Sequence, residues 1–309
     1  MASPHEILTK LTNAIEKEVN GFDKSVPALQ KGMYNRVLEM LKNLELKNGR
    51  IQASVKNILM IGKIKAELET LILNKAYVKQ VNGFLTAFDT VDALQKSYFS
   101  EVAVEVTPNK LLGALKHDAV KYTADSLTKM GVNSKVLPGI ETILRSNIAG
   151  GGSMADLTDQ LRQYITTTKT KNGESLGALQ RHTRQITTDA VNQYSANYNA
   201  AISQDLGFEW YAYQGSLLAT SRPWCRHMVK KRFVHKSELK TVIFDQIDGV
   251  KICSKEIPCS KKTDLPSGMI EGTNESNVII RRGGWNCGHQ FGGVPSAMVP
   301  KSLRDKFAI

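Results

Sequence analysis

Apolar residues recur at helical spacing through the first two thirds of the chain, and this pattern restricts the possible folds more than any other sequence feature. Ser3-Pro4 can begin a helix, and apolar side chains follow at helical intervals from Ile7 to Val19. Thr107-Pro108-Asn109 is a second start signal. Further helices are predicted over residues 26–44, 54–72, 77–102, 110–130, 136–148, 153–168 and 176–206.

The pattern changes after Gly207, where the last long helix is expected to end. Residues 208–213 are rich in aromatic side chains and predict a strand, and the apolar runs 242–244 and 278–280 predict two more. Glycines, polar loops and all four cysteines lie among these short segments. The sequence therefore predicts an α+β protein whose short antiparallel strands are confined to the C-terminal part.

A chain of 309 residues is long enough for two domains. We expect a mainly helical N-terminal region over residues 1–175, with a flexible break at the glycines of 149–152. A small α+β module led by a long helix is expected over 176–309.

Positive charge is concentrated in the last third of the chain. The formal net charge is +12, and residues 215–309 hold 16 Lys and Arg against 8 Asp and Glu, a net of +8. Such an excess favours an anionic partner, either DNA phosphates or an acidic protein surface, over a merely solvated face. The candidate contact residues are Arg226, Lys230, Lys231, Arg232, Arg281 and Arg282.

No apolar stretch approaches the roughly 20 residues of a membrane span, and the first residues do not resemble a signal peptide. We therefore expect a protein made and kept in a cytoplasm. In that reducing compartment a cluster of cysteines is more often metal-binding than disulfide-bonded.

Two matching tripeptides, Cys225-Arg226-His227 and Cys287-Gly288-His289, suggest such a site. On a strand, residues two apart point to the same face, so each tripeptide could aim a thiolate and an imidazole at one point. Cys225, His227, Cys287 and His289 would then form a tetrahedral zinc site.

Cys253 and Cys259 leave other arrangements open. They could replace the histidines in a site of four thiolates, or they could form a local disulfide in an oxidising medium. Alternatively, the cysteines are small core residues without any further role.

Sequence patterns typical of enzymes are missing. We find no Gly-x-Ser-x-Gly, no His-Glu-x-x-His, no phosphate-binding loop and no dinucleotide fingerprint. Cys225 and His227 could imitate a nucleophile pair, but neighbours two residues apart rarely form the required hydrogen bond. The sequence therefore predicts a protein that is not an enzyme.

The order of motifs in residues 176–299 resembles the C-terminal domain of phage head morphogenesis (Mu F-like minor head) proteins. A long helix ends at Gly207 and a tryptophan-bearing strand follows at Trp210. The segment Thr220 to His227 takes the Arg/Pro/Cys position, Lys231-Arg232-Phe233 the next strand, and Trp285 to His289 the closing motif. Two departures are the missing acidic residue before the Arg/Pro segment and the missing His-Pro before the closing motif.

This resemblance implies a structural protein of the virion. Members of the family act in several copies at the portal or capsid, in head assembly or in DNA packaging and delivery, and are not generally enzymes. The expected partners are the portal protein, the major capsid protein and packaged DNA. The alternatives are a zinc-dependent nucleic-acid-binding or nuclease module and, less favoured, a toxin fused to a head module.

Overall fold

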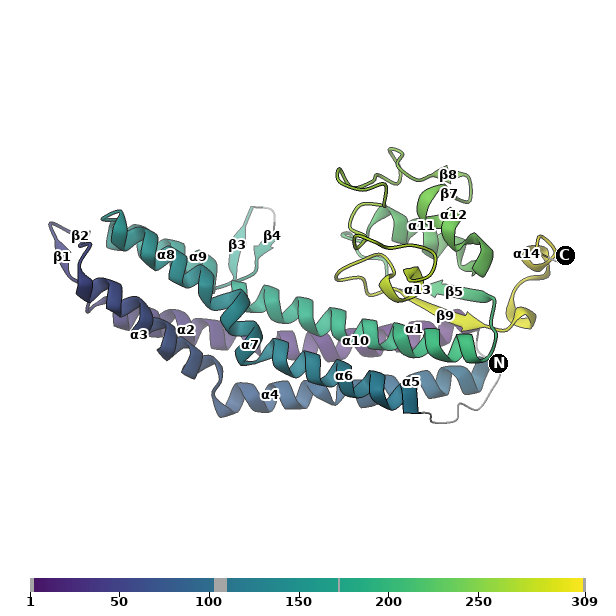
Figure 1. Ribbon diagram of the computed structural model, residues 1–309, viewed down its shortest axis with the longest axis horizontal. Helices are drawn as coiled ribbons and strands as arrows, with labels where there is room; N and C mark the ends of the chain where they lie inside the picture. The colour runs from purple at the N-terminus through teal and green to yellow at the C-terminus, as the bar shows by residue number, and fades with distance from the viewer. Residues whose placement is uncertain (1–2, 103–109, 172, 308–309) are drawn as a thin grey trace. The chain divides into compact units, whose positions relative to one another are not determined.

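The computed structural model describes residues 3–102, 110–171 and 173–307, and it shows an α+β protein that is 64% helical (Figure 1). The fold class predicted from the sequence is confirmed. Thr107-Pro108-Asn109 lies outside the described residues. Among those described, no helix combines the length and the apolar character that a membrane crossing requires.

The chain forms two compact units, and each is built from separate stretches of sequence. Unit 1 contains Met1–Glu18, Thr86–Val120 and Thr188–Ile309, and unit 2 contains Val19–Leu85 and Lys121–Thr187. This division differs from a simple split after residue 175, because two segments of the helical region pack with the C-terminal module in unit 1.

Unit 2 is helical apart from two small hairpins. Ser54 and Ser153 cap two of its helices by accepting a hydrogen bond from the backbone three residues ahead, at Asn57 and Asp156. Its elements are α2 (Val26–Leu41), β1 (Leu46–Lys47), β2 (Arg50–Ile51), α3 (Val55–Ile72), α4 (Lys75–Leu85), α7 (Lys129–Gly131), a π-helical turn (Val132–Val136), α8 (Leu137–Ala149), α9 (Met154–Ile165), β3 (Thr168–Thr170) and β4 (Gly173–Ser175). The predicted helix over 77–102 is two helices, since α4 ends at Leu85.

Three helices contribute residues to both units, and one long helix belongs to unit 1 alone. The shared helices are α1 (Pro4–Asp23), α6 (Lys110–Leu127) and α10 (Ala178–Asp205), and the helix of unit 1 is α5 (Ala87–Val102). The 28 residues of α10 confirm the long helix predicted before Gly207.

A three-stranded antiparallel sheet organises the C-terminal part of unit 1. Strand β5 (Trp210–Gln214) lies between β6 (Phe233–His235) and β9 (Gln290–Val294), with Trp210 opposite His235 on one side and Val294 on the other. The remaining elements are α11 (Pro223–Lys231), a 3-10 turn (Lys236–Glu238), α12 (Leu239–Phe244), β7 (Gln246–Ile247), β8 (Val250–Lys251), α13 (Val278–Arg281), a second 3-10 turn (Ser296–Met298) and α14 (Lys301–Arg304).

Two of the strands predicted here were wrong, because residues 242–244 and 278–280 lie in α12 and α13. A run of three apolar residues is too short for its period to separate strand from helix. Tertiary contacts select the helix for residues 242–244. Val242 and Ile243 are both buried, and the indole of Trp224 donates to the Val242 carbonyl at 2.7 Å.

Side chains from two helices satisfy the backbone of edge strand β9. The Tyr98 hydroxyl of α5 donates to the Gly293 carbonyl at 2.9 Å, and the Asn199 side-chain oxygen of α10 accepts from the Gly293 N–H at 2.8 Å. This close approach requires glycine. A Cβ at Gly292 would lie 2.5 Å from the Tyr98 hydroxyl, and one at Gly293 would collide with the Ser203 hydroxyl.

We predict that Gly293→Ala destabilises the protein by about 1–3 kcal/mol, because the added methyl overpacks the contact between β9 and α10. Urea unfolding followed by circular dichroism measures the change. Gly288→Ala is the matched control, since a Cβ at Gly288 meets no atom within 4 Å. Equal stability of the two variants would contradict the prediction.

Candidate metal centre

Three buried side chains of unit 1 form a cluster that could hold a metal ion. They are Cys225, Cys287 and His289, with exposed fractions of 1%, 2% and 5%. The two sulfur atoms are 3.9 Å apart, and the Cys287 sulfur is 3.6 Å from Nδ1 of His289. All three potential ligand atoms lie within 4.8 Å of one another.

These separations fit tetrahedral coordination. Zinc lies about 2.3 Å from a thiolate and about 2.0–2.1 Å from an imidazole nitrogen, so tetrahedral angles place two sulfurs about 3.8 Å apart and a sulfur and a nitrogen about 3.6 Å apart. The observed 3.9 Å between the two sulfurs and 3.6 Å between the Cys287 sulfur and His289 match these values, and the third separation, from the Cys225 sulfur to His289, is within 4.8 Å. The cluster is thus a possible metal site with three protein ligands.

The three ligands come from two parts of the chain, helix α11 and the loop between α13 and β9, and local features of the sequence fix each part. Pro223 occupies the first turn of α11 and sets the start of the helix that carries Cys225. Between α13 and Cys287 the chain turns sharply, with positive φ at Gly284 (99°) and Asn286 (57°). His289 immediately precedes β9, so the sheet holds it beside the cluster.

Gly283 and Gly215 give the cluster its space. A Cβ at Gly283 would collide with the Cys225 sulfur and lie 3.1 Å from the Cys287 sulfur, and one at Gly215 would lie 2.7 Å from the His289 ring. Neither position therefore tolerates a side chain without displacing a potential ligand.

His227 lies outside the cluster, because the strand assumed for Cys225-Arg226-His227 is the helix α11. Residues two apart on a helix point about 200° apart, so burying Cys225 turns the His227 side chain elsewhere. Cys287 and His289, by contrast, both point into the cluster. The structure thus joins three of the four predicted ligands.

The two thiols differ in their proton affinity. The hydrogen bond with Cys225, and then His289 and Arg282, hold the pKa of Cys287 well below its usual range despite burial. The hydrogen bond with Cys287 and burial raise the pKa of Cys225. Cys287 is accordingly the sulfur better suited to be the thiolate, which is the form that binds a metal.

A polar layer contributed by α10 surrounds the closing segment. The carboxylate of Asp189 accepts from the Asn286 N–H at 2.6 Å, and Arg282 donates to the Asn192 carbonyl at 2.6 Å. Gln290 donates to the Asn192 side-chain oxygen at 2.7 Å. This layer was not predicted from the sequence. Its signal was the run of polar residues at helical spacing in the predicted long helix, among them Asp189 and Asn192.

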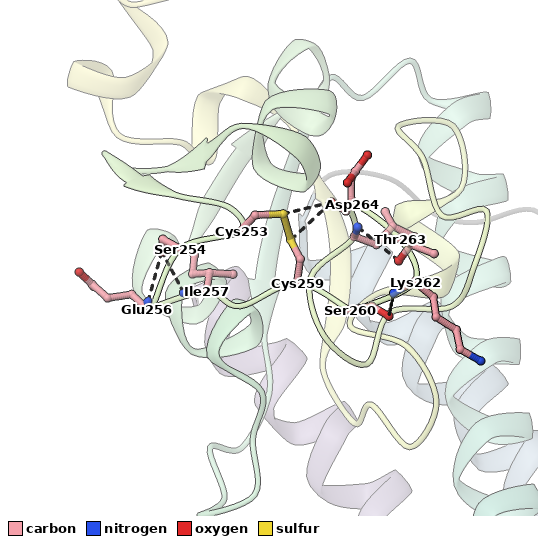
Figure 2. Close-up of a disulfide and its surroundings, with 10 residues drawn as sticks. Cys253, Ser254, Glu256, Ile257, Cys259, Ser260, Lys262, Thr263 and Asp264 are labelled. Atoms are coloured by element: carbon pink, nitrogen blue, oxygen red, sulfur yellow. Dashed lines mark hydrogen bonds between the residues drawn. A yellow bond between two sulfur atoms is a disulfide. The ribbon is translucent and has the colours of Figure 1, made fainter.

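The other two cysteines do not join the cluster. Cys253 and Cys259 form a disulfide with each other, as Figure 2 shows, and both sulfurs lie near the Asp264 carbonyl oxygen, at 3.7 and 3.5 Å. A site of four thiolates is therefore wrong, and of the two alternatives for this pair the structure has the local disulfide.

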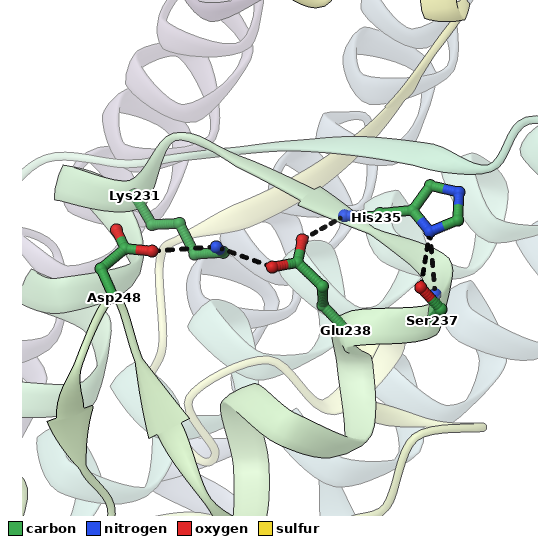
Figure 3. Close-up of polar contacts among 5 residues, drawn as sticks. All are labelled: Lys231, His235, Ser237, Glu238 and Asp248. Carbon is green, nitrogen blue, oxygen red and sulfur yellow. Dashed lines mark hydrogen bonds and ion pairs between the residues drawn. The ribbon is translucent and has the colours of Figure 1, made fainter. Parts of the chain in front are cut away.

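Lys231 is not a free surface cation. Its ammonium lies 3.0 Å from carboxylate oxygens of both Glu238 and Asp248, and only 13% of its side chain is exposed (Figure 3). Burial lowers its pKa, but the two carboxylates outweigh this and raise it. The other oxygen of Glu238 accepts from the His235 N–H at 3.0 Å, so the pair ties α11 to β6.

Most other predicted contact residues also serve the fold. Arg226 donates to the carbonyls of residues 218, 219 and 221, and Arg281 to the carbonyl of Glu271. Arg282 is 3% exposed, so its place on a binding surface was wrong. Lys230 and Arg232 are the exposed members of the predicted set that make no side-chain hydrogen bond or ion pair within the described ranges.

Comparison with known proteins adds no relative: no family model, no curated protein and no solved structure matches this chain. The likeness to phage minor head proteins therefore rests on the motifs and their order alone.

We predict that Cys287→Ser and His289→Ala each lower zinc affinity by at least tenfold, because each removes a ligand. His227→Ala should bind zinc as the wild type does, because His227 lies outside the cluster. Competition with a chromophoric chelator measures the dissociation constants. Loss of affinity on changing His227 would show that the ligand set is different.

A second prediction concerns pH. Burial raises the pKa of Asp189, so its carboxylate ionises at lower pH in the unfolded chain than in the folded one. The protein should lose stability as pH rises from about 4 through the folded pKa, and Asp189→Asn should remove this loss. Urea unfolding in EDTA between pH 4 and pH 7 tests it.

Asp159 provides the control, because its hydrogen bond with Arg162 lowers its pKa. Asp159→Asn should therefore change the pH dependence in the opposite direction and at lower pH, since the stability that Asp159 contributes is lost as pH falls below about 4, so the control is measured down to about pH 2. The prediction for Asp189 would be contradicted if the difference in free energy of unfolding between wild type and Asp189→Asn did not grow with pH.

Proposed function

We propose that this chain is a structural minor head protein of a phage, present in several copies in the virion. It acts at the portal or capsid in head assembly or in DNA packaging and delivery, and it is not an enzyme. The observation that carries the proposal is the meeting of two distant motifs. The Arg/Pro/Cys segment and the closing segment, which the resemblance singles out, bring Cys225 and Cys287 together across 62 residues.

We further propose that the ion of this centre is zinc and that its role is structural. Two thiolates and an imidazole suit zinc, which has no redox chemistry of its own. Buried ligands on α11 and on the loop before β9 allow the ion to hold these two parts of the module together. Metal binding would then contribute directly to the stability of the module.

Burial of the centre favours the structural role over the nuclease alternative. A hydrolytic site needs an open coordination position that a phosphodiester can reach. All three ligands are buried, and the carboxylate of Asp189 is buried as well and bonded to the backbone of Asn286. Three protein ligands leave a fourth coordination position, but the burial of the cluster suits a structural ion better than cleavage of DNA.

The exposed cations Lys230 and Arg232 are the residues that we assign to an anionic partner, either packaged DNA or an acidic face of the portal or capsid protein. Both lie at the end of α11, next to β6. Fewer cations than the sequence suggested are free for this contact, since Lys231 and Arg282 are engaged within the unit.

Quantitative mass spectrometry of density-purified particles from the source system tests the proposal. We predict that the chain is present at a low and constant copy number, and that Cys225→Ser combined with Cys287→Ser reduces its incorporation severalfold. His227→Ala is the control and should be incorporated normally. Absence of the wild-type chain from particles would reject the structural role and favour metal-dependent nucleic-acid binding.

A further inference from the structure

We propose that Tyr213 is a positioning residue of the metal centre: its ring fixes the orientation of His289, and its hydroxyl donates a hydrogen bond to a metal-bound thiolate. The inference rests on the proposed zinc centre and assigns to it a residue that the cysteine and histidine pattern does not contain. Tyr213 lies on the central strand β5 and is fully buried.

The Tyr213 ring is held in place from three sides. It stacks on the His289 ring with the ring planes 7° apart and the centroids 5.6 Å apart. Trp224 and Phe291 meet it edge to face, with centroids at 5.6 Å and 4.7 Å. Trp224 is the neighbour of Cys225 in the chain, so the same packing fixes both the tyrosine and one of the ligands.

The imidazole of His289 depends on this stack for its orientation. A metal-bound histidine usually donates its second ring N–H to a carboxylate or a carbonyl, which fixes the ring. Here Nδ1 faces the Cys287 sulfur, and the buried Nε2 has no hydrogen-bond partner among the described residues. Offset stacking on Tyr213 supplies the constraint that the missing hydrogen bond would have provided.

The Tyr213 hydroxyl is buried and makes no hydrogen bond within the described ranges. Leaving such a group unpaired costs about 1–3 kcal/mol. Tyr98 and Tyr194 avoid the cost by donating to the Gly293 carbonyl and to Asp92, whereas the Tyr198 hydroxyl is also without a partner among the described residues. The sulfurs of Cys225 and Cys287 are polar neighbours of the Tyr213 hydroxyl.

A thiol is a weak acceptor, but a metal-bound thiolate carries negative charge and accepts hydrogen bonds well. The hydroxyl therefore gains a charged acceptor in place of a weak one when the ion is bound and the cysteines are deprotonated. Its bond withdraws charge from the sulfur in a site that water does not reach. Partners of this kind, beyond the ligands themselves, are typically worth 10- to 100-fold in metal affinity.

Tyr213→Phe tests the hydroxyl alone, because phenylalanine keeps the ring and its stack. In the full-length protein we expect zinc affinity to fall about 10- to 100-fold. In the cobalt(II)-substituted protein the sulfur-to-cobalt charge-transfer band should shift. Tyr211→Phe is the matched control: it makes the same change on the same face of β5, where Tyr211 contacts Phe291, and should leave affinity and spectrum unchanged.

Stability measured with and without the ion separates this role from a merely structural one. In EDTA, Tyr213→Phe should be at least as stable as the wild type, because it removes an unpaired buried hydroxyl. With zinc, it should gain less stability than the wild type does. Tyr213→Leu, which also removes the stack, should weaken zinc binding further than Tyr213→Phe.

Wild-type affinity and an unshifted cobalt spectrum in Tyr213→Phe would overturn the inference while leaving the zinc centre intact. Failure of the wild-type chain to bind zinc or cobalt would overturn both this inference and the metal centre. The virion experiment is independent of either result, since it measures incorporation into particles. The three failures are therefore distinguishable.

Discussion

Unit 1 is organised around one constraint: most of the polar residues buried along α10 need hydrogen-bond partners from the elements packed against this helix. Ser195 accepts from Gln95 of α5, and Asn199 bonds both Gln95 and the backbone of β9. Asn192 accepts from Arg282 and Gln290. Because an unpaired buried polar group costs as much as several favourable contacts gain, this stripe fixes the register of α5 and β9 on α10.

The geometry of the candidate metal centre follows from that register. Asn199 bonds the backbone of β9, Asp189 bonds the backbone of Asn286, and Asn192 accepts from Arg282. These bonds restrict the positions of Cys287 and His289, which lie between the bonded residues. Cys225 is brought to them independently by α11, whose Trp224 is anchored to the Val242 carbonyl. A single ion could then join two parts of the module that reach the site by different routes, which is the usual role of a structural metal in a small domain.

Many of the positive charges in unit 1 are also paired within the unit. The C-terminal third has an excess of cations, yet Lys231, Arg226 and Arg282 all satisfy carboxylates or carbonyls of their own unit. Guanidinium groups can span several carbonyls at once, which suits them to loop-rich modules with little regular structure. A cationic composition in such a module therefore overstates the charge that remains for a partner.

Local patterns in the sequence determined much of this protein. Helical periodicity and the caps at Ser54 and Ser153 define helices of unit 2, and the fold class follows from the change in pattern after Gly207. Tertiary structure alone decided that residues 242–244 and 278–280 are helical, that His227 lies outside the cluster and that Tyr213 stacks on His289. The physical reason is the sequence separation over which each effect acts. Periodicity and capping depend on residues a few positions apart, whereas a buried site depends on which residues distant in the sequence pack together away from water.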